Sequence, residues 1–157
     1  MNLEELKPKN IFKVTGDVFF IPVNCVGVMG AGIAKEFKER YPELFKQYVK
    51  DCRYNVITVG NPITYVGPNN DRHYVMFPTK DNWQNGSQLI WIAQGLENFK
   101  DQIGDEISED AVLVIPPLGC GHGKLDYSQV KGVIKEFAKT VNNPIKLIAP
   151  FVAANNF

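Results

Sequence analysis

The sequence has few cysteines, and their spacing predicts neither a metal site nor a disulfide framework. Cys25, Cys52 and Cys120 are odd in number and lack the paired spacing of such sites. A chain of this kind suits a reducing compartment. We therefore expect a cytoplasmic protein with no bound metal.

Long apolar runs and an excess of one charge are also missing. No stretch approaches the ~20 apolar residues that a membrane span needs, and the N-terminal MNLEELKPKN lacks the apolar region of a signal peptide. Lysine plus arginine and aspartate plus glutamate each number 17, so no overall positive charge drives non-specific binding to nucleic acid or anionic lipid. We expect no secretion, no membrane partner, and only local contact with any nucleic acid.

Internal repeats and low-complexity segments are absent, and apolar runs alternate with helical patterns throughout. The 157 residues are 45% hydrophobic and 22% charged, which predicts a single folded domain over residues 1–157. The predicted strands are 11–14, 17–24, 63–67, 73–78, 111–118 and 145–151, and the predicted helices follow GAG at 30–32, begin at Pro42, span 87–103 and follow Asp126. This order predicts a three-layer α/β/α fold with a mixed central sheet.

Two glycine-rich loops each follow a predicted strand and precede a predicted helix. They lie in VNCVGVMGAGIA (23–34) and PPLGCGHGKLD (116–126). Glycine lets backbone N–H groups approach an anion closely, and a helix N-terminus adds unpaired donors. The first loop matches neither the Walker A loop nor the dinucleotide fingerprint. Because strand ends of an open sheet meet at one edge, the pair predicts a pyrophosphate held from two sides.

Lys80 follows a strand that ends at Pro78, in VMFPTKDNW (75–83). A lysine close to another cation or an apolar wall loses its proton near neutral pH and attacks a sugar aldehyde to form a Schiff base. The alternative is a solvated surface lysine. Trp83 beside it either stacks on a base or covers the core.

Three further side chains have both a chemical and a structural interpretation. His122 is either an acid/base or a loop residue that tolerates unusual backbone angles. Asp17, in VTGDV, either accepts a hydrogen bond from an adenine amino group or caps a turn. Phe151, just beyond the last predicted strand, either stacks on a purine or completes the core.

With these motifs assembled, the chain resembles a macrodomain, the ADP-ribose-binding fold, over nearly its whole length. The motifs are TGDV, VNCVGVMGAGIAKEFK, FPTKDNW and IPPLGCGHGKLD, in this order. More narrowly, they are similar to the macrodomains of antitoxin-type DNA ADP-ribosyl glycohydrolases, which remove ADP-ribose from DNA bases. The resemblance implies ADP-ribose as ligand or product, with no cofactor.

The resemblance also implies a role for each motif. Asp17, with Val18 beside it, would hold the adenine amino group, Asn24 would orient the distal ribose, and Lys80 would be catalytic. The ligand would be wrapped on one side by Gly30, Ala31, Gly32 and Ile33, on the other by Leu118, Gly119, Cys120, Gly121, His122 and Gly123, with Phe151 at the purine.

Two departures from the family pattern bear on the substrate and the mechanism. Gly123 stands where the terminal ADP-ribose protein glycohydrolase has an assisting Asp; the antitoxin-type pattern also lacks that Asp, which favours a nucleic-acid-linked substrate. Val28 and Met29 occupy the stretch where more widespread macrodomains carry a second Asn, so schemes that use this Asn do not transfer.

We therefore predict hydrolysis of the glycosidic link between ADP-ribose and a nucleic-acid base or protein side chain. Two alternatives stay open: an ADP-ribose 1″-phosphate phosphatase, in which His122 takes part, and a reader that binds ADP-ribose without turnover. The expected partners are ADP-ribose and ADP-ribosylated nucleic acid or protein. The sequence indicates no oligomeric state.

Overall fold

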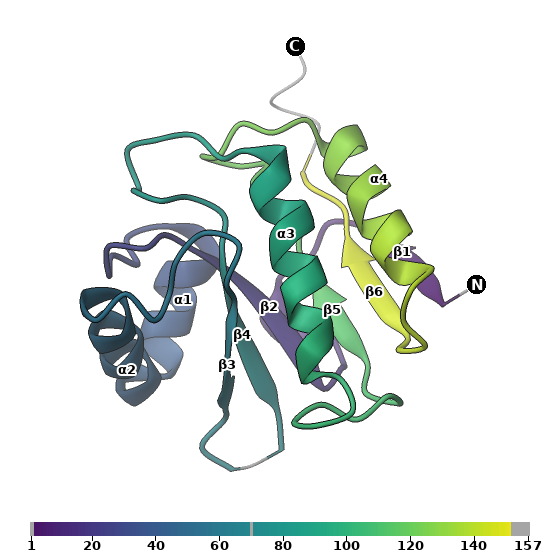
Figure 1. Cartoon of the computed structure of the whole chain (residues 1–157), viewed down its shortest axis with the longest axis horizontal. Coiled ribbons are helices and arrows are strands. Elements are labelled where there is room, and N and C mark those ends of the chain that lie inside the picture. Colours follow the sequence, from purple (N-terminus) through teal and green to yellow (C-terminus); the bar gives the residue numbers. More distant parts are fainter. Residues whose placement is uncertain (1, 70, 152–157) are drawn as a thin grey trace.

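A six-stranded mixed sheet lies between two pairs of helices in the computed structural model, which describes residues 2–69 and 71–151 (Figure 1). The strands are β1 (Leu3–Leu6), β2 (Val18–Val23), β3 (Ile63–Val66), β4 (His73–Pro78), β5 (Leu113–Ile115) and β6 (Ile145–Ile148). The helices are α1 (Gly32–Arg40), α2 (Pro42–Arg53), α3 (Leu89–Phe99) and α4 (Tyr127–Ala138), with 3-10 turns η1 (Ile11–Lys13) and η2 (Lys100–Gln102). The predicted α/β/α architecture is confirmed.

The strand order, β1-β6-β5-β2-β4-β3, determines which loops meet. Every neighbouring pair is parallel except β3 and β4, which form an antiparallel hairpin. The carboxyl ends of β2, β4 and β5 therefore lie at one edge of the sheet, and the loops that follow them leave from that edge (Figure 1). We call this side of the sheet, at the carboxyl ends of β2, β4 and β5, the loop edge.

The two faces of the sheet pack against different helix pairs. Along β2, Val18 and Phe20 belong to the core under α3 and α4, whereas Phe19 and Ile21 belong to the core under α1 and α2. The ring centroids of Phe20 and Phe99 are 4.8 Å apart, an edge-on aromatic contact that ties α3 to the sheet. Burial on both faces explains why β2 reads as a continuous apolar run.

The sequence prediction was wrong at the N-terminus. Residues 11–13 form η1 instead of a strand, because the Asn10 side chain accepts a hydrogen bond from Phe12 N at 2.8 Å and caps the turn. The missed strand is β1, which pairs only with β6 and carries exposed Glu4 and Glu5. An edge strand with polar side chains shows no apolar signal in sequence.

Replacing two helical glycines by alanine should change the free energy of unfolding in opposite directions. A Cβ at Gly95 of α3 would lie 2.8 Å from Cε2 of the buried Phe77, whereas a Cβ at Gly132 of α4 meets no atom within 4 Å. We expect Gly95→Ala to lower the free energy of unfolding by about 1–3 kcal/mol through overpacking. Gly132→Ala should raise it by about 0.5–1 kcal/mol through backbone entropy. Urea unfolding measures both; a Gly95→Ala protein as stable as the unmodified chain would contradict this packing.

Candidate functional site

Three loops are joined by hydrogen bonds at the loop edge. We call residues 24–31, after β2, the first glycine-rich loop; residues 79–88, after β4, the Lys80 loop; and residues 116–126, after β5, the second glycine-rich loop. Cys25 N donates to Asp81 O at 3.2 Å, and Ser87 N donates to Gly123 O at 3.0 Å. The Lys80 loop is therefore bonded to both glycine-rich loops, and the structure brings these predicted segments together.

Asn24 fixes the path of the first glycine-rich loop. Its side chain is 7% exposed, and its Oδ1 accepts hydrogen bonds from Val26 N at 3.1 Å and Val28 N at 3.3 Å. Its Nδ2 donates to Val28 O at 2.8 Å, and the Tyr48 hydroxyl donates to Oδ1 at 2.8 Å. Asn24 is thus a positioning residue for the loop. The second hydrogen of its amide remains for a ribose hydroxyl, and that contact stays a prediction.

The N-terminus of α1 presents backbone donors at the end of the first glycine-rich loop. Its N-cap residue, Ala31, makes no side-chain hydrogen bond, so the first-turn N–H groups of Gly32, Ile33 and Ala34 have no side-chain cap. Gly32 has φ 58°, a left-handed conformation that glycine adopts without strain, and it is exposed together with Gly30 and Ala31. The helix dipole adds partial positive charge here. This arrangement suits an anion such as a phosphate.

The second glycine-rich loop packs closely against the Lys80 loop. Gly119 has φ 74°, and a Cβ there would lie 3.2 Å from Ser87 Cβ. Gly123 is buried, and a Cβ there would lie 2.9 Å from Ser87 Cβ. Gly121 and His122 are exposed at the loop's tip, whereas Leu118 is fully buried beneath it. The tip is therefore the part of this loop that can meet a ligand.

The two loop cysteines are neutral thiols. Burial raises the pKa of Cys25 to about 12 and the pKa of Cys120 to about 11. Because only the thiolate is a strong nucleophile, neither thiol is activated near neutral pH.

Lys80 is half-buried, on a loop that is bonded to the other two loops. Burial lowers its pKa, and the nearby Lys124 ammonium of the second glycine-rich loop lowers it further. A lowered pKa enlarges the fraction of neutral, nucleophilic amine at a given pH. Among the described residues, no ion pair involves Lys80. Lys80 is thus less exposed than a fully solvated lysine, and its catalytic role stays a prediction.

Asp17 and Val18 lie at the opposite edge of the sheet, and this corrects their predicted adenine contact. Asp17 precedes β2, and its Oδ2 accepts a hydrogen bond from Val112 N at 2.8 Å; Val18 is fully buried. Since β2 rises about 3.3 Å per residue, they lie about 20 Å from the loop edge. The motif VTGDV does not show at which end of β2 a ligand would lie.

Phe151 follows β6 at the loop edge, where its side chain is 75% exposed. It is therefore not a core residue, and its stacking role stays a prediction. Residues 7–10, which follow β1, also lie at the loop edge, because β1 runs parallel to β6 and Ala149 N donates to Leu6 O at 3.0 Å. The sequence did not predict that residues 7–10 lie at the loop edge, because it did not predict β1.

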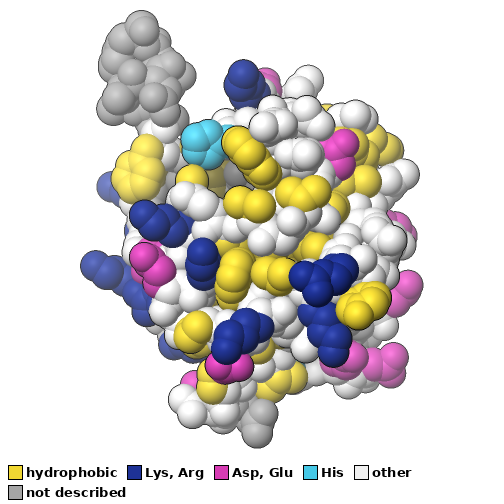
Figure 2. All heavy atoms as spheres, turned by 90° about the vertical axis from the view of Figure 1, so that its left-hand side faces the viewer, with side chains coloured by type: hydrophobic (Ala, Val, Ile, Leu, Met, Phe, Trp, Pro, Cys, Tyr) yellow, Lys and Arg dark blue, Asp and Glu magenta, His cyan; other side chains and the backbone are white. Residues whose placement is uncertain are grey.

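Trp83 is an exposed aromatic residue on the Lys80 loop. Its side chain is 53% exposed, which excludes the alternative that it covers the core. The turn around it is fixed, because Gln84 N donates to Asn82 Oδ1 at 3.1 Å and Asn85 Nδ2 donates to Asp81 Oδ1 at 3.2 Å. The side of the molecule that carries α1 and α2 shows hydrophobic side chains among lysines and arginines (Figure 2).

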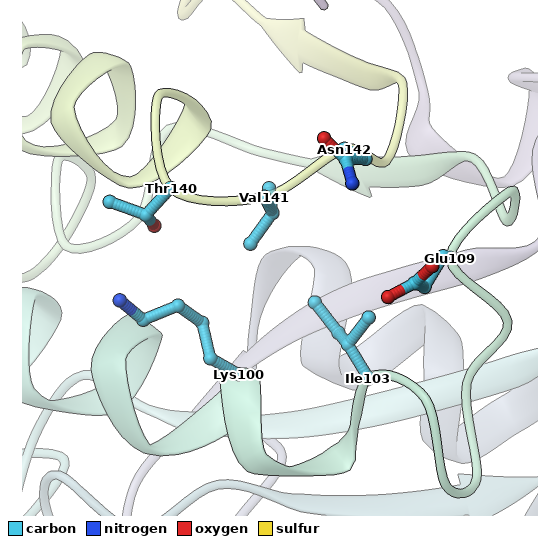
Figure 3. Close-up of a pocket in the computed structure, with 6 residues that line it drawn as sticks. All are labelled: Lys100, Ile103, Glu109, Thr140, Val141 and Asn142. Atoms are coloured by element: carbon cyan, nitrogen blue, oxygen red, sulfur yellow. The ribbon is translucent and has the colours of Figure 1, made fainter.

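Two hollows of the structure lie away from the three loops. One of about 190 Å³ is lined by Lys100, Ile103, Glu109 and residues 140–142 (Figure 3). Another of about 400 Å³ lies beside Asp17 and His73. Both are formed by segments that lead into the amino ends of strands. Within residues 2–69 and 71–151, no cluster of three or more potential ligands could hold a metal, and no helix is long and apolar enough to span a bilayer.

Comparison with known proteins agrees with this arrangement. Residues 22–134 match the Macro domain family. A protein named DNA ADP-ribosyl glycohydrolase from Mycobacterium tuberculosis (strain ATCC 25618 / H37Rv) is 41% identical over 111 residues, which cover 69% of this chain and 31% of that protein. The chain thus spans about a third of the length of such curated relatives.

Solved structures show the same fold. The macrodomain of Mycobacterium tuberculosis DarG superposes with a TM-score of 0.83 and 30% identity, covering 94% of this chain and 100% of that one. Thermosipho africanus DarTG in complex with ADP-ribose gives a TM-score of 0.81 at 27% identity, covering 96% of this chain and 42% of that one. From the sheet order, the paired glycine-rich loops and these matches, the chain belongs to the Macro domain family.

Proposed function

We propose that the protein binds ADP-ribose across the loop edge and hydrolyses the glycosidic bond that joins it to a nucleic-acid base. The observation that carries this is Lys80, half-buried and with a lowered pKa, on a loop bonded to both glycine-rich loops. A structural neighbour was solved with ADP-ribose, and curated relatives are named for glycohydrolysis of ADP-ribosylated DNA.

The chain's own groups account for binding and for bond cleavage. The N–H groups at the start of α1 and in the second glycine-rich loop hold the two phosphates. The neutral Lys80 amine attacks C1″ of the distal ribose, and the base leaves with the bonding electron pair. The amine loses a proton as the base gains one. Opening of the sugar gives a Schiff base on Lys80, and one water then releases ADP-ribose and restores the amine.

Three substrates test this proposal. The protein is incubated with ADP-ribosylated DNA, ADP-ribosylated protein and ADP-ribose 1″-phosphate, and products are followed by mass spectrometry. We expect ADP-ribose from the DNA substrate alone. Release from protein alone, release of phosphate alone, and binding without turnover would each contradict the proposal, and would support a protein-directed glycohydrolase, a phosphatase and a reader respectively.

We expect the Trp83 side chain to stack on the leaving base. Stacking of one base on an aromatic side chain contributes about 1–3 kcal/mol. Trp83→Ala should therefore weaken binding of an ADP-ribosylated oligonucleotide by about 5- to 150-fold and leave the Kd of free ADP-ribose unchanged. Val66→Ala is the matched control, because Val66 is 48% exposed on β3 at the opposite edge. Equal losses for both ligands would contradict a role at the base.

A further inference from the structure

We propose that Tyr48 of α2 is a positioning residue for the distal ribose, because its hydroxyl fixes the side-chain amide of Asn24. This role rests on the proposed binding of ADP-ribose at the loop edge, and it belongs to a residue that none of the sequence motifs contains. Tyr48 lies outside the three loops, in a helix beside the first glycine-rich loop (Figure 1).

The Tyr48 side chain is fully buried, and its hydroxyl meets two oxygens of one residue. The hydroxyl donates to Asn24 O at 2.9 Å and to Asn24 Oδ1 at 2.8 Å. Because a hydroxyl has one hydrogen, this hydrogen is shared between the backbone oxygen and the side-chain oxygen. The shared bond fixes the Asn24 side chain relative to its own backbone and to α2.

Other contacts from the same helix hold the first glycine-rich loop against α2. Cys52 lies one turn after Tyr48, on the same face of the helix, and its Sγ is 4.0 Å from Asn24 O. Gly27 has φ 80°, and a Cβ there would lie 3.6 Å from Cα of Val49. The helix α2 therefore contacts the loop at residues 24 and 27.

The Tyr48 hydroxyl gives Asn24 a connection that the loop itself cannot supply. Val26 N and Val28 N also donate to Oδ1, but they belong to the loop and would move with it. Asn24 O, directly after the last residue of β2, receives its hydrogen bonds from side chains, the Tyr48 hydroxyl and the Cys52 thiol. A buried carbonyl that loses its strong donor is costly, so without the hydroxyl we expect the start of the loop to shift.

The position of Asn24 decides where its free amide hydrogen points. Nδ2 donates one hydrogen to Val28 O at 2.8 Å, which leaves the other for a ligand hydroxyl. In the proposed complex this hydroxyl belongs to the distal ribose, whose C1″ is attacked by Lys80. A shift of Asn24 therefore weakens the contact with the ribose and misaligns C1″. The phosphates are held by other groups, at the start of α1 and in the second glycine-rich loop.

The test removes the hydroxyl oxygen and compares two ligands. ADP carries two phosphates, as ADP-ribose does, but lacks the distal ribose. Tyr48→Phe should weaken the binding of ADP-ribose by about 3- to 10-fold and change the Kd of ADP by less than about twofold, as measured by calorimetry. Equal losses for the two ligands would overturn the proposal, because the effect would then lie on the loop as a whole.

Tyr65→Phe is the matched control. Tyr65 is also buried, and its hydroxyl donates at 2.6 Å to Oδ2 of Asp51, a different residue of α2. This variant loses the same atom and a hydrogen bond to the same helix, so it should lower the free energy of unfolding and leave both Kd values unchanged. A loss of ADP-ribose affinity equal to that of Tyr48→Phe would show a general effect of α2 stability and would overturn the proposal.

A double-mutant cycle shows whether Tyr48 acts through the Asn24 side chain. Asn24→Ala removes the amide, so adding Tyr48→Phe to it should cause no further loss of ADP-ribose affinity. Losses that simply add would contradict a role through this amide.

These binding measurements separate the role of Tyr48 from the proposed hydrolysis. Neither ligand carries a glycosidic bond to a base, so the role of Tyr48 can be shown even in a protein that binds ADP-ribose without turnover. A failure of hydrolysis appears with the three substrates above and overturns the proposed function alone. An unchanged Kd of ADP-ribose in Tyr48→Phe overturns the role of Tyr48 alone, and no binding of ADP-ribose by the unmodified protein overturns both.

Discussion

Replacing Lys80 by alanine is expected to reduce the release of ADP-ribose from ADP-ribosylated DNA by about 10³-fold or more, because it removes the proposed nucleophile. The Kd of ADP-ribose should change by less than about threefold, since the phosphate ligands that we propose are backbone N–H groups of α1 and the second glycine-rich loop. Single-turnover kinetics and calorimetry measure the two quantities. Lys139→Ala is the control for loss of a lysine elsewhere on the surface.

Lys80→Arg distinguishes nucleophilic from electrostatic catalysis. Arginine keeps the positive charge but is not deprotonated in proteins, so it cannot form a Schiff base. We expect this variant to be as inactive as Lys80→Ala. Borohydride added during turnover should attach ADP-ribose to Lys80 in the unmodified protein and to neither variant. An active Lys80→Arg protein would contradict the covalent mechanism but would not contradict the binding of ADP-ribose.

Much of the fold was predictable because its signals are local. The neighbouring strands β3 and β4 were predicted from the runs 63–67 and 73–78, and α4 follows Asp126 as predicted; the Asp126 side chain accepts a hydrogen bond from Ser128 N. The helix predicted over 87–103 begins at Leu89, and its N-cap residue, Gln88, makes no side-chain hydrogen bond. The Ser87 hydroxyl is buried without a hydrogen-bond partner in the described structure.

The candidate site was predictable in its loops and less so in its electrostatics. Two glycine-rich segments after strands must meet when those strands are parallel neighbours, so β2 and β5 bring them to one edge. Asp17 was misplaced because a short motif does not show on which side of a strand the ligand lies. The partial burial of Lys80 could not be predicted, because it depends on contact between segments distant in sequence, which no local pattern encodes.

The contact between the Lys80 loop and the second glycine-rich loop can be tested by adding one methyl group. A Cβ at Gly123 would collide with the Ser87 hydroxyl and the Gly119 carbonyl oxygen, and it would lie 2.9 Å from Ser87 Cβ. We expect Gly123→Ala to weaken ADP-ribose binding by about 10- to 100-fold and to lower the free energy of unfolding by about 1–3 kcal/mol. Gly132→Ala is the control for binding, because a Cβ there meets no atom within 4 Å and residue 132 lies on α4, outside the three loops.

A second variant identifies which atoms collide with the added methyl group. Ser87→Gly removes the hydroxyl and Cβ that crowd position 123 but leaves the Gly119 carbonyl in place. The double variant Ser87→Gly, Gly123→Ala should therefore recover only part of the lost affinity, and a double-mutant cycle measures that part. Full recovery would show that the side chain alone excludes the methyl group. Equal binding by the Gly132→Ala and Gly123→Ala proteins would contradict phosphate binding by the second glycine-rich loop in this packed conformation, and with it the pyrophosphate held from two sides.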